Sequence, residues 1–142
     1  MLLHIIARGK IGRSPESELV ERYLKRISWP TKLTELSEMA QLPPMAGTAG
    51  TAITVLLDEK GKALSSKELA AKVEQWRDRG VREVRFVIGA ADGHSNDERR
   101  HADLLLSFGP ATWPHLLVRA MLAEQLFRVT SILANHPYHR EG

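Results

Sequence analysis

Apolar and polar residues change their spacing along the chain, and these changes predict strands and helices in alternation. Residues 2–7 are an apolar run rich in strand-forming residues, which predicts a buried strand. Ser14 and Pro15 then offer an N-cap and a first helical residue, and apolar residues recur behind them at helical spacing. We therefore expect a helix that ends near Pro30. Residues 31–36 alternate polar with apolar side chains and predict a second strand, a candidate for a sheet edge.

The middle of the chain repeats the order of strand and helix. Residues 52–57 form an unbroken apolar run with β-branched members, as expected of a strand buried on both faces of a parallel sheet. Residues 58–64 are expected to form a loop. Ser65 and Glu68 then make a capping box at the start of the next helix, and Gly80 lies where a C-terminal cap belongs.

The last third of the chain adds two more strands and two more helices. Residues 84–88 predict a strand, and Ser95 with Glu98 forms a second capping box that opens a short helix. Residues 104–108 predict the last strand.

The final helix is expected over residues 115–135, with Pro137 as its stop. It is apolar on nearly all sides, so several of its faces must be covered. A homodimer would cover what a small domain leaves exposed, with Leu117, Met121 and Phe127 as candidate contacts. The alternative is a helix at the centre of the monomer.

Strands that alternate with helices predict one α/β domain over residues 1–142, with a doubly wound, largely parallel sheet and helices on both faces. The length of 142 residues, with 43% hydrophobic and 26% charged content, is typical of a single globular domain. In such a sheet, ligands bind at the carboxyl ends of the strands.

Composition narrows the possible chemistry. The chain has no cysteine, which excludes disulfides, thiolate metal ligands and thiol nucleophiles. Its 20 basic and 17 acidic residues make a polyanionic partner plausible without requiring one. The N-terminal apolar run has no basic lead, and the longest apolar stretch, residues 116–134, is broken by charged side chains. We therefore expect a cytoplasmic protein without a membrane span.

Common nucleotide and metal motifs are missing from the sequence. No G-x-G-x-x-G follows the first strand, and Gly61 with Lys62 lacks the upstream glycine and the following hydroxyl of a P-loop. His136 and His139 are the one pair at a metal-like spacing, with no acidic or thiol ligand beside them. We therefore expect neither NAD, ATP nor a metal ion.

Three loops directly follow predicted strands: Leu57 with Asp58, residues 89–93, and residues 109–114. They should meet at one edge of the sheet. Glycines after buried strands let the backbone approach a ligand closely, which suits a neutral purine better than a phosphate. Taken alone, each glycine fits an ordinary turn equally well, and Trp113 could belong to the core.

The C-terminal segments IGAADG (88–93), SFGPATWPHLLVRAMLAEQLFRVTSILA (107–134) and NHPYHRE (135–141) together resemble one family. It comprises the SPOUT-type, trefoil-knotted methyltransferases that act on N3 of a pseudouridine in large-subunit (23S) ribosomal RNA. The resemblance is dense over about the last 60 residues. It extends more loosely to LLDEKGKALSS (56–66), to the first strand and to residues 21–26.

A chain this short, with only a modest positive charge, offers few phosphate contacts to free RNA, so we expect the assembled ribosome as the substrate. The resemblance implies a C-terminal trefoil knot that holds S-adenosyl-L-methionine, and a homodimer. It also implies a set of cofactor contacts at the three loops, formed by Leu57, Gly89, Ala90, Gly109, Pro110, Ala111, Thr112, Trp113 and Pro114. The family usually has a second glycine at the position of Ala90. The connection over residues 37–51, which contains proline and glycine, is also shorter than the family leads us to expect.

The resemblance further implies that the HPYHR tail receives RNA near the cofactor of the partner subunit, with Arg128 facing the reacting region. Methyl transfer to an imide nitrogen requires alignment of the reactants and removal of one proton. His139 is the candidate base, Tyr138 could stack on the target base, and Arg128 could orient it or stabilise its anion. A histidine near a terminus can also be merely solvated, so the identity of the base stays open.

Two other functions are compatible with parts of the sequence. A non-catalytic RNA-binding or ribosome-assembly factor would keep the knotted fold without the cofactor, and Ala90 is the sign that favours it. A flavodoxin-like nucleotide binder would share the α/β sheet, but it leaves the HPYHR tail unexplained. Binding of S-adenosylhomocysteine separates the first alternative from the enzyme, and bound flavin would identify the second.

Overall fold

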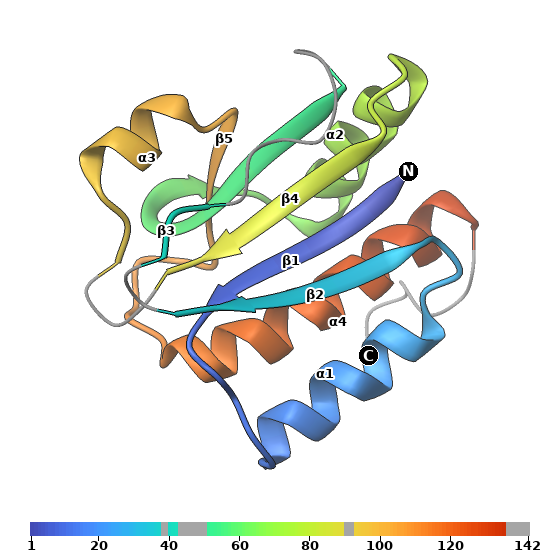
Figure 1. The fold of residues 1–142 in the computed structure, drawn as a ribbon. Coiled ribbons are helices and arrows are strands. Elements are labelled where there is room, and N and C mark those ends of the chain that lie inside the picture. Colours follow the sequence, from blue (N-terminus) through green and yellow to red (C-terminus); the bar gives the residue numbers. More distant parts are fainter. Residues whose placement is uncertain (38–39, 43–50, 90–92, 136–142) are drawn as a thin grey trace.

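A computed structural model describes residues 1–37, 40–42, 51–89 and 93–135 of the chain. Strands and helices alternate through these ranges (Figure 1). In chain order the elements are β1 (Leu2–Arg8), α1 (Pro15–Arg26), β2 (Thr31–Leu36), β3 (Ala52–Ala63), α2 (Ser66–Asp78), β4 (Glu83–Ile88), α3 (Asn96–His101), β5 (Leu104–Ser107) and α4 (His115–Leu133).

The strands form one sheet in the order β2-β1-β4-β3-β5, and every neighbouring pair is parallel. This confirms the predicted α/β class and the position of β2 at a sheet edge. All five carboxyl ends consequently lie at one edge of the sheet, where the loops that follow β3, β4 and β5 meet.

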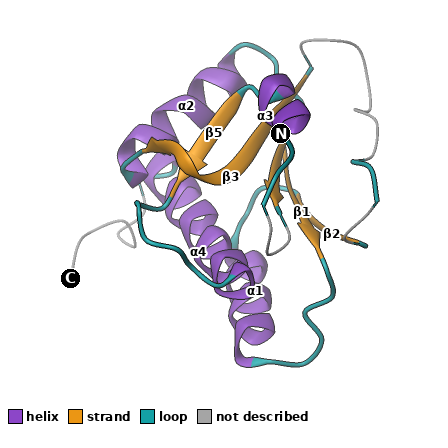
Figure 2. Cartoon of the chain, turned by 90° about the vertical axis from the view of Figure 1, so that its left-hand side faces the viewer, coloured by secondary structure: helices purple, strands orange, loops and turns teal. Residues whose placement is uncertain are grey.

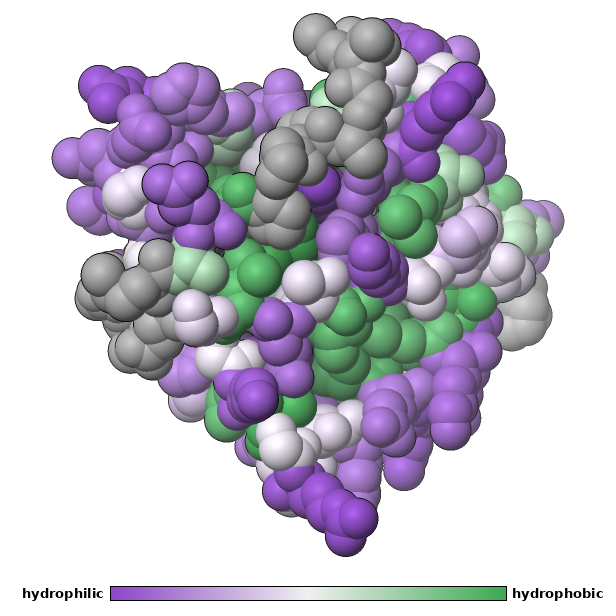
Figure 3. Space-filling view, viewed as in Figure 1, coloured by the Kyte–Doolittle hydropathy of each residue, from purple (hydrophilic) through white to green (hydrophobic). Residues whose placement is uncertain are grey.

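The two faces of the sheet are covered differently. Helices α1, α2 and α4 pack on one face, and the short α3 lies on the other (Figure 2). The main core lies under the three longer helices, where Phe86, Leu122 and Leu126 are fully buried. A smaller cluster of Ile6, Leu56 and Val87 lies on the opposite face. That face shows apolar surface near the middle of the sheet and below β2, within a hydrophilic surround (Figure 3).

Strand β3 is longer than the sequence indicates, and the loop expected over residues 58–64 is wrong. β3 runs on to Ala63 and curls so that Lys62 pairs with Leu106 and Ala63 with Ser107 of β5. Gly61 permits this curl, because a Cβ there would lie 2.5 Å from the Leu105 carbonyl carbon.

Local capping signals place the helix starts correctly. The Ser14 side chain accepts from the Ser17 amide at 3.1 Å, and both predicted capping boxes, at Ser65 and Ser95, are present. The final helix ends at Leu133, earlier than expected. Asn135 adopts a φ of +57°, the left-handed conformation that commonly ends helices, before Pro137 is reached.

Candidate functional site

A pocket of about 330 Å³ lies at the carboxyl edge of the sheet. The ends of β3, β4 and β5 form it together with α3 and the first turn of α4. Its walls consist of Leu57, Asp58, Glu59, Lys60, Ile88, Gly89, Gly93, His94, Arg99, Leu106, Phe108, Gly109, Ala111, Thr112, Trp113, His115 and Val118. The pocket therefore occupies the edge at which an α/β sheet binds ligands.

Six of the nine residues predicted to contact the cofactor line this one pocket: Leu57, Gly89, Gly109, Ala111, Thr112 and Trp113. Pro110 and Pro114 belong to the same loop but do not line it. Ala90 lies outside the described residues. The structure thus brings three distant segments together, while the ligand they bind stays a prediction.

Glycine is favoured at two points of the pocket for different reasons. A Cβ at Gly89 would lie 3.1 Å from the carbonyl carbon of Gly93 and 3.2 Å from Cε1 of His94, so a side chain there would require its neighbours in the turn after β4 to shift by a few tenths of an ångström. Gly109 has a φ of +109°, which side chains strongly disfavour, and the space beside it is open. The open space at Gly109 is available to a ligand.

The loop between β5 and α4 is held by its own hydrogen bonds. The Gly109 amide donates to Oγ of Ser107 at 3.0 Å, and Oγ1 of Thr112 donates to the Glu59 carboxylate at 3.2 Å. Nε1 of Trp113 donates to the Phe108 carbonyl at 3.4 Å. Trp113 is 43% exposed, so it is a wall of the pocket rather than a core residue.

Sequence reasoning missed a buried histidine in the wall of the pocket, His94. Nε2 of His94 lies 2.9 Å from the Leu57 carbonyl, and this contact joins β3, at the point where it begins to curl, to the segment after β4. Nδ1 is buried without a hydrogen-bond partner among the described residues, 4.0 Å from the Glu98 carboxylate. Burial lowers the pKa of His94 and outweighs the Leu57 hydrogen bond and the nearby carboxylates, which act to raise it. His94 is therefore predominantly neutral at pH 7.

Asp58 and Arg99 form a second polar contact in the wall of the pocket. Nε of Arg99 donates to the Asp58 carboxylate at 2.6 Å, and the Lys60 amide donates to its other oxygen at 2.9 Å. Burial acts to raise the pKa of Asp58, but these hydrogen bonds and the charge of Arg99 outweigh it and lower the pKa. Asp58 is therefore ionised and already paired.

The described residues show no metal centre and no membrane span. No group of three or more His, Asp or Glu side chains in those ranges is arranged to hold a metal ion. No helix there is both long and apolar enough to cross a bilayer. His136 and His139, the pair with metal-like spacing, lie outside the described residues.

Known proteins match this chain along its length. A family model described as "Predicted SPOUT methyltransferase" matches residues 1–139. The chain belongs to the SPOUT methyltransferase family. It is 68% identical over 142 residues to "Ribosomal RNA large subunit methyltransferase H" of Erythrobacter litoralis, with all of both chains covered. The protein of that name from Zymomonas mobilis is 58% identical, again over all of both chains.

A third relative bears on the length of this SPOUT methyltransferase. The protein with the same name from Maricaulis maris is 46% identical over 156 aligned residues, which cover 99% of this chain and all of the relative. Because the alignment is longer than the 142 residues here, that relative carries residues that this chain lacks. The full-length match in Erythrobacter litoralis shows that the compact form is shared.

Family membership confirms the expected fold class and rules out the flavodoxin-like alternative. SPOUT methyltransferases have a trefoil knot, an exception to the usual absence of knots in proteins. The sheet and its helices on both sides agree with the family's α/β architecture.

Arg128 lies far from the pocket of this SPOUT methyltransferase. It follows Val118, the last α4 residue that lines the pocket, by ten residues, which corresponds to about 15 Å along the helix. Its Nε and Nη2 donate to Oε1 of Glu124 at 2.9 Å and 2.6 Å. Tyr138 and His139 lie outside the described residues. Within one chain, the structure does not bring Arg128 to the predicted cofactor contacts.

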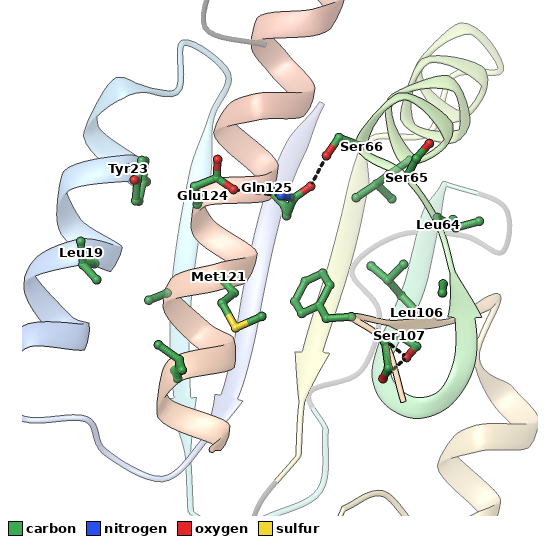
Figure 4. Close-up of a pocket in the computed structure, with 16 residues that line it drawn as sticks. Leu19, Tyr23, Leu64, Ser65, Ser66, Leu106, Ser107, Met121, Glu124 and Gln125 are labelled. Carbon is green, nitrogen blue, oxygen red and sulfur yellow. Dashed lines mark hydrogen bonds between the residues drawn. The ribbon is translucent and has the colours of Figure 1, made fainter. Parts of the chain in front are cut away.

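A second hollow, a groove of about 650 Å³, runs along α4 (Figure 4). Leu19 and Tyr23 of α1 line one side, and Ser65 and Ser66 at the start of α2 line the other. Oγ of Ser66 donates to Oε1 of Gln125 across it at 2.6 Å. At its inner end the groove shares three residues with the pocket: Leu106, Phe108 and Gly109.

The three apolar residues considered as dimer contacts differ in whether they line this groove. Leu117 and Met121 line it and face open space. Phe127 instead packs on Tyr23 within the chain, with ring centroids 6.2 Å apart. Leu117 and Met121 are therefore the better candidates for contact with a second subunit.

Proposed function

We propose that this protein is an S-adenosyl-L-methionine-dependent methyltransferase that methylates N3 of a pseudouridine in large-subunit (23S) ribosomal RNA. It acts in the cytoplasm as a homodimer on the assembled ribosome. The observation that carries the proposal is the convergence of three loops, distant in sequence, on one pocket in a SPOUT methyltransferase fold. The name shared by the full-length relatives supports the class of substrate.

The residues of the pocket fit the proposed cofactor. A volume of about 330 Å³ lies within the range of small-molecule sites. Apolar walls and glycine backbone suit a purine. Glu59 also lines the pocket and forms no ion pair among the described residues, so its carboxylate, which accepts a hydrogen bond from Thr112, could face a ligand of positive charge, whereas Asp58 is paired with Arg99. S-adenosyl-L-methionine, when bound, supplies an electrophilic methyl group.

The chain's own residues would hold the cofactor, orient the target base and remove its imide proton. Leu57, Gly89 and the loop over residues 109–114 would hold the cofactor. The tight turn at Gly89 and the hydrogen bond between His94 and the Leu57 carbonyl hold the segments at Leu57 and Gly89 in fixed positions relative to each other. Arg128 would orient the target base and stabilise its anion, and His139 would accept the imide proton.

A homodimer would bring Arg128 of one subunit to the predicted cofactor contacts of the other, because these residues lie apart within one chain. Arg128 lies about 15 Å along α4 from Val118, the last α4 residue that lines the pocket of its own chain, so it would serve the pocket of another subunit. The groove beside α4 provides an apolar surface that leads to the pocket through Phe108 and Gly109. A second subunit seated there would bring its residues to this chain's cofactor contacts.

The assembled ribosome is the proposed substrate because this chain has few ways to hold free RNA. It forms one domain with a formal net charge of +3, which allows few phosphate contacts. The surface of a ribosomal particle can supply the missing contacts.

Transfer of labelled methyl groups tests the function. Intact ribosomes, separated subunits and purified ribosomal RNA from a strain lacking the enzyme are each incubated with the protein, and the modified nucleoside is identified by mass spectrometry. We expect N3-methylpseudouridine, formed efficiently on particles alone. Efficient labelling of protein-free RNA would contradict the particle requirement, and another product would overturn the substrate assignment.

Calorimetry distinguishes the enzyme from a non-catalytic assembly factor. An intact pocket binds S-adenosylhomocysteine, whereas a factor that has lost the cofactor does not. Absence of binding would favour the assembly factor.

A further inference from the structure

The loop between β1 and α1, residues 9–14, lies at the same sheet edge as the pocket. Ala7 pairs with Ile88 in the sheet, so the loop begins one strand away from Gly89. In Figure 1 it descends from the end of β1, past the first turn of α4, to the start of α1. The tip of the molecule where it meets α1 is hydrophilic (Figure 3).

This loop is firmly anchored. The Gly9 amide donates to the Leu36 carbonyl at 2.7 Å, and the Ile11 amide donates to the Glu35 carboxylate at 2.9 Å. Nη2 of Arg119, from the second turn of α4, donates to the Gly9 carbonyl at 3.1 Å. Nη1 of the same arginine pairs with Glu35. Strand β2 and helix α4 thus hold the loop from two sides.

The anchored loop presents two basic side chains to solvent. Lys10 and Arg13 are both exposed, and neither forms an ion pair among the described residues. No acidic residue occurs in the first fifteen positions of the chain. The charge of Lys10 helps to lower the pKa of Glu35, but the Glu35 carboxylate is paired with Arg119, and the next acidic residues, Glu16 and Glu18, belong to the first turn of α1. Arg8 adds little, because it is buried and bonded to Glu98.

We propose that residues 9–14 form a phosphate-contacting element for the RNA substrate, with Lys10 and Arg13 as the contacting side chains. The inference rests on the proposed function and adds a surface to it. An RNA strand whose target base enters the pocket carries phosphates on both sides of that base. A rigid loop beside the pocket meets them without ordering its backbone on binding, which lowers the entropic cost of association.

The test is the double variant Lys10→Gln with Arg13→Gln, assayed for methyl transfer to ribosomal particles over a range of salt concentrations. Lost phosphate contacts weaken binding and reduce its salt dependence, by about one unit of slope per contact. We expect the KM for particles to rise roughly tenfold at low salt, with kcat little changed. The slope of the logarithm of affinity against the logarithm of salt concentration should become less steep by about two.

Lys25→Gln with Arg26→Gln is the matched control. It removes the same charge from the exposed last turn of α1, at the opposite edge of the sheet. We expect this control to keep the wild-type KM and slope. The charge-conserving pair Lys10→Arg with Arg13→Lys should also retain most of the wild-type affinity.

Three outcomes overturn the inference. The first is an equal effect of both glutamine pairs, which would indicate bulk charge alone. The second is a wild-type KM in the Lys10 and Arg13 variant. The third is a loss of S-adenosylhomocysteine binding or a changed mass by light scattering, which would assign the loop to the fold. If wild-type protein labels no particle, the proposed function fails instead, so the two failures are distinguishable.

Discussion

The two ends of α4 are held in different ways. Near its start, Arg119 is 1% exposed and bonded to Glu35 and to the Gly9 carbonyl, so other elements fix this end beside the pocket. Further along, Arg128 is bonded to Glu124 on its own helix and is partly exposed. The first end is complete within one chain. The second presents Arg128, which does not line this chain's pocket.

In the proposed homodimer, this difference would divide the work between subunits. Each chain would form its own cofactor pocket, and Arg128 would orient the RNA base at the pocket of the partner. The groove beside α4 connects the two regions. Each prediction below tests one side of this comparison.

The largest effect is expected at the pocket itself. Gly109→Trp places a large side chain in the open space of the loop before α4, so binding of S-adenosylhomocysteine should be lost. Gly80→Trp is a matched control, since Gly80 also has a positive φ, of +86°, but follows α2 at the other edge of the sheet. Isothermal calorimetry measures both. Unchanged affinity in Gly109→Trp would place the cofactor elsewhere.

The ion pair at the start of α4 should contribute far more to stability than the one further along. Glu35→Gln leaves Arg119 buried with an uncompensated charge, which should lower the free energy of unfolding by about 3 kcal/mol. Glu124→Gln breaks a partly exposed pair within one helix and should cost less than about 1 kcal/mol. Urea denaturation measures the two, and equal losses would remove the contrast between the two ends.

Much of the fold follows from local sequence signals. The capping boxes at Ser65 and Ser95 and the apolar runs of the strands depend on neighbouring residues, and the structure confirms them. The extension of β3 depends on pairing with β5, more than forty residues away. An isolated glycine at position 61 was the one local sign of such a close approach.

The pocket shows the same division between local and distant causes. Glycine-containing loops after strands located its edge, because parallel strands align their carboxyl ends. The contact of His94 with Leu57 spans 37 positions of the sequence, and that of Arg99 with Asp58 spans 41. The spacing of apolar residues cannot predict contacts between such distant positions. Arg119 had a visible signal: an arginine inside an otherwise apolar helix needs a buried partner.

Mixed dimers test whether the active site is shared. Arg128→Ala should reduce methyl transfer about 100-fold and keep S-adenosylhomocysteine binding, and Gly109→Trp should be inactive for lack of cofactor. Subunits of the two variants, unfolded together and refolded, should regain about a quarter of wild-type activity, because half of the dimers carry one intact composite site. If each chain used its own Arg128, the mixture would stay inactive.

The smallest effect is expected from His94, which lies on the pocket side of the comparison. Burial lowers the pKa of His94 in the folded state. Near pH 6.5 the histidine therefore becomes protonated in the unfolded chain while it is still neutral in the folded chain. The free energy of unfolding should therefore fall as the pH is lowered from about 6.5 toward 5, before the carboxylates begin to titrate. His94→Leu should flatten this part of the profile, whereas His101→Leu should not, because His101 is exposed on α3. Thermal unfolding at closely spaced pH values, with S-adenosylhomocysteine affinity measured alongside, provides the readout. An unchanged slope in His94→Leu would show that the buried ring does not resist protonation. A flattened slope with weakened affinity would show that its bond to the Leu57 carbonyl also keeps the pocket in register.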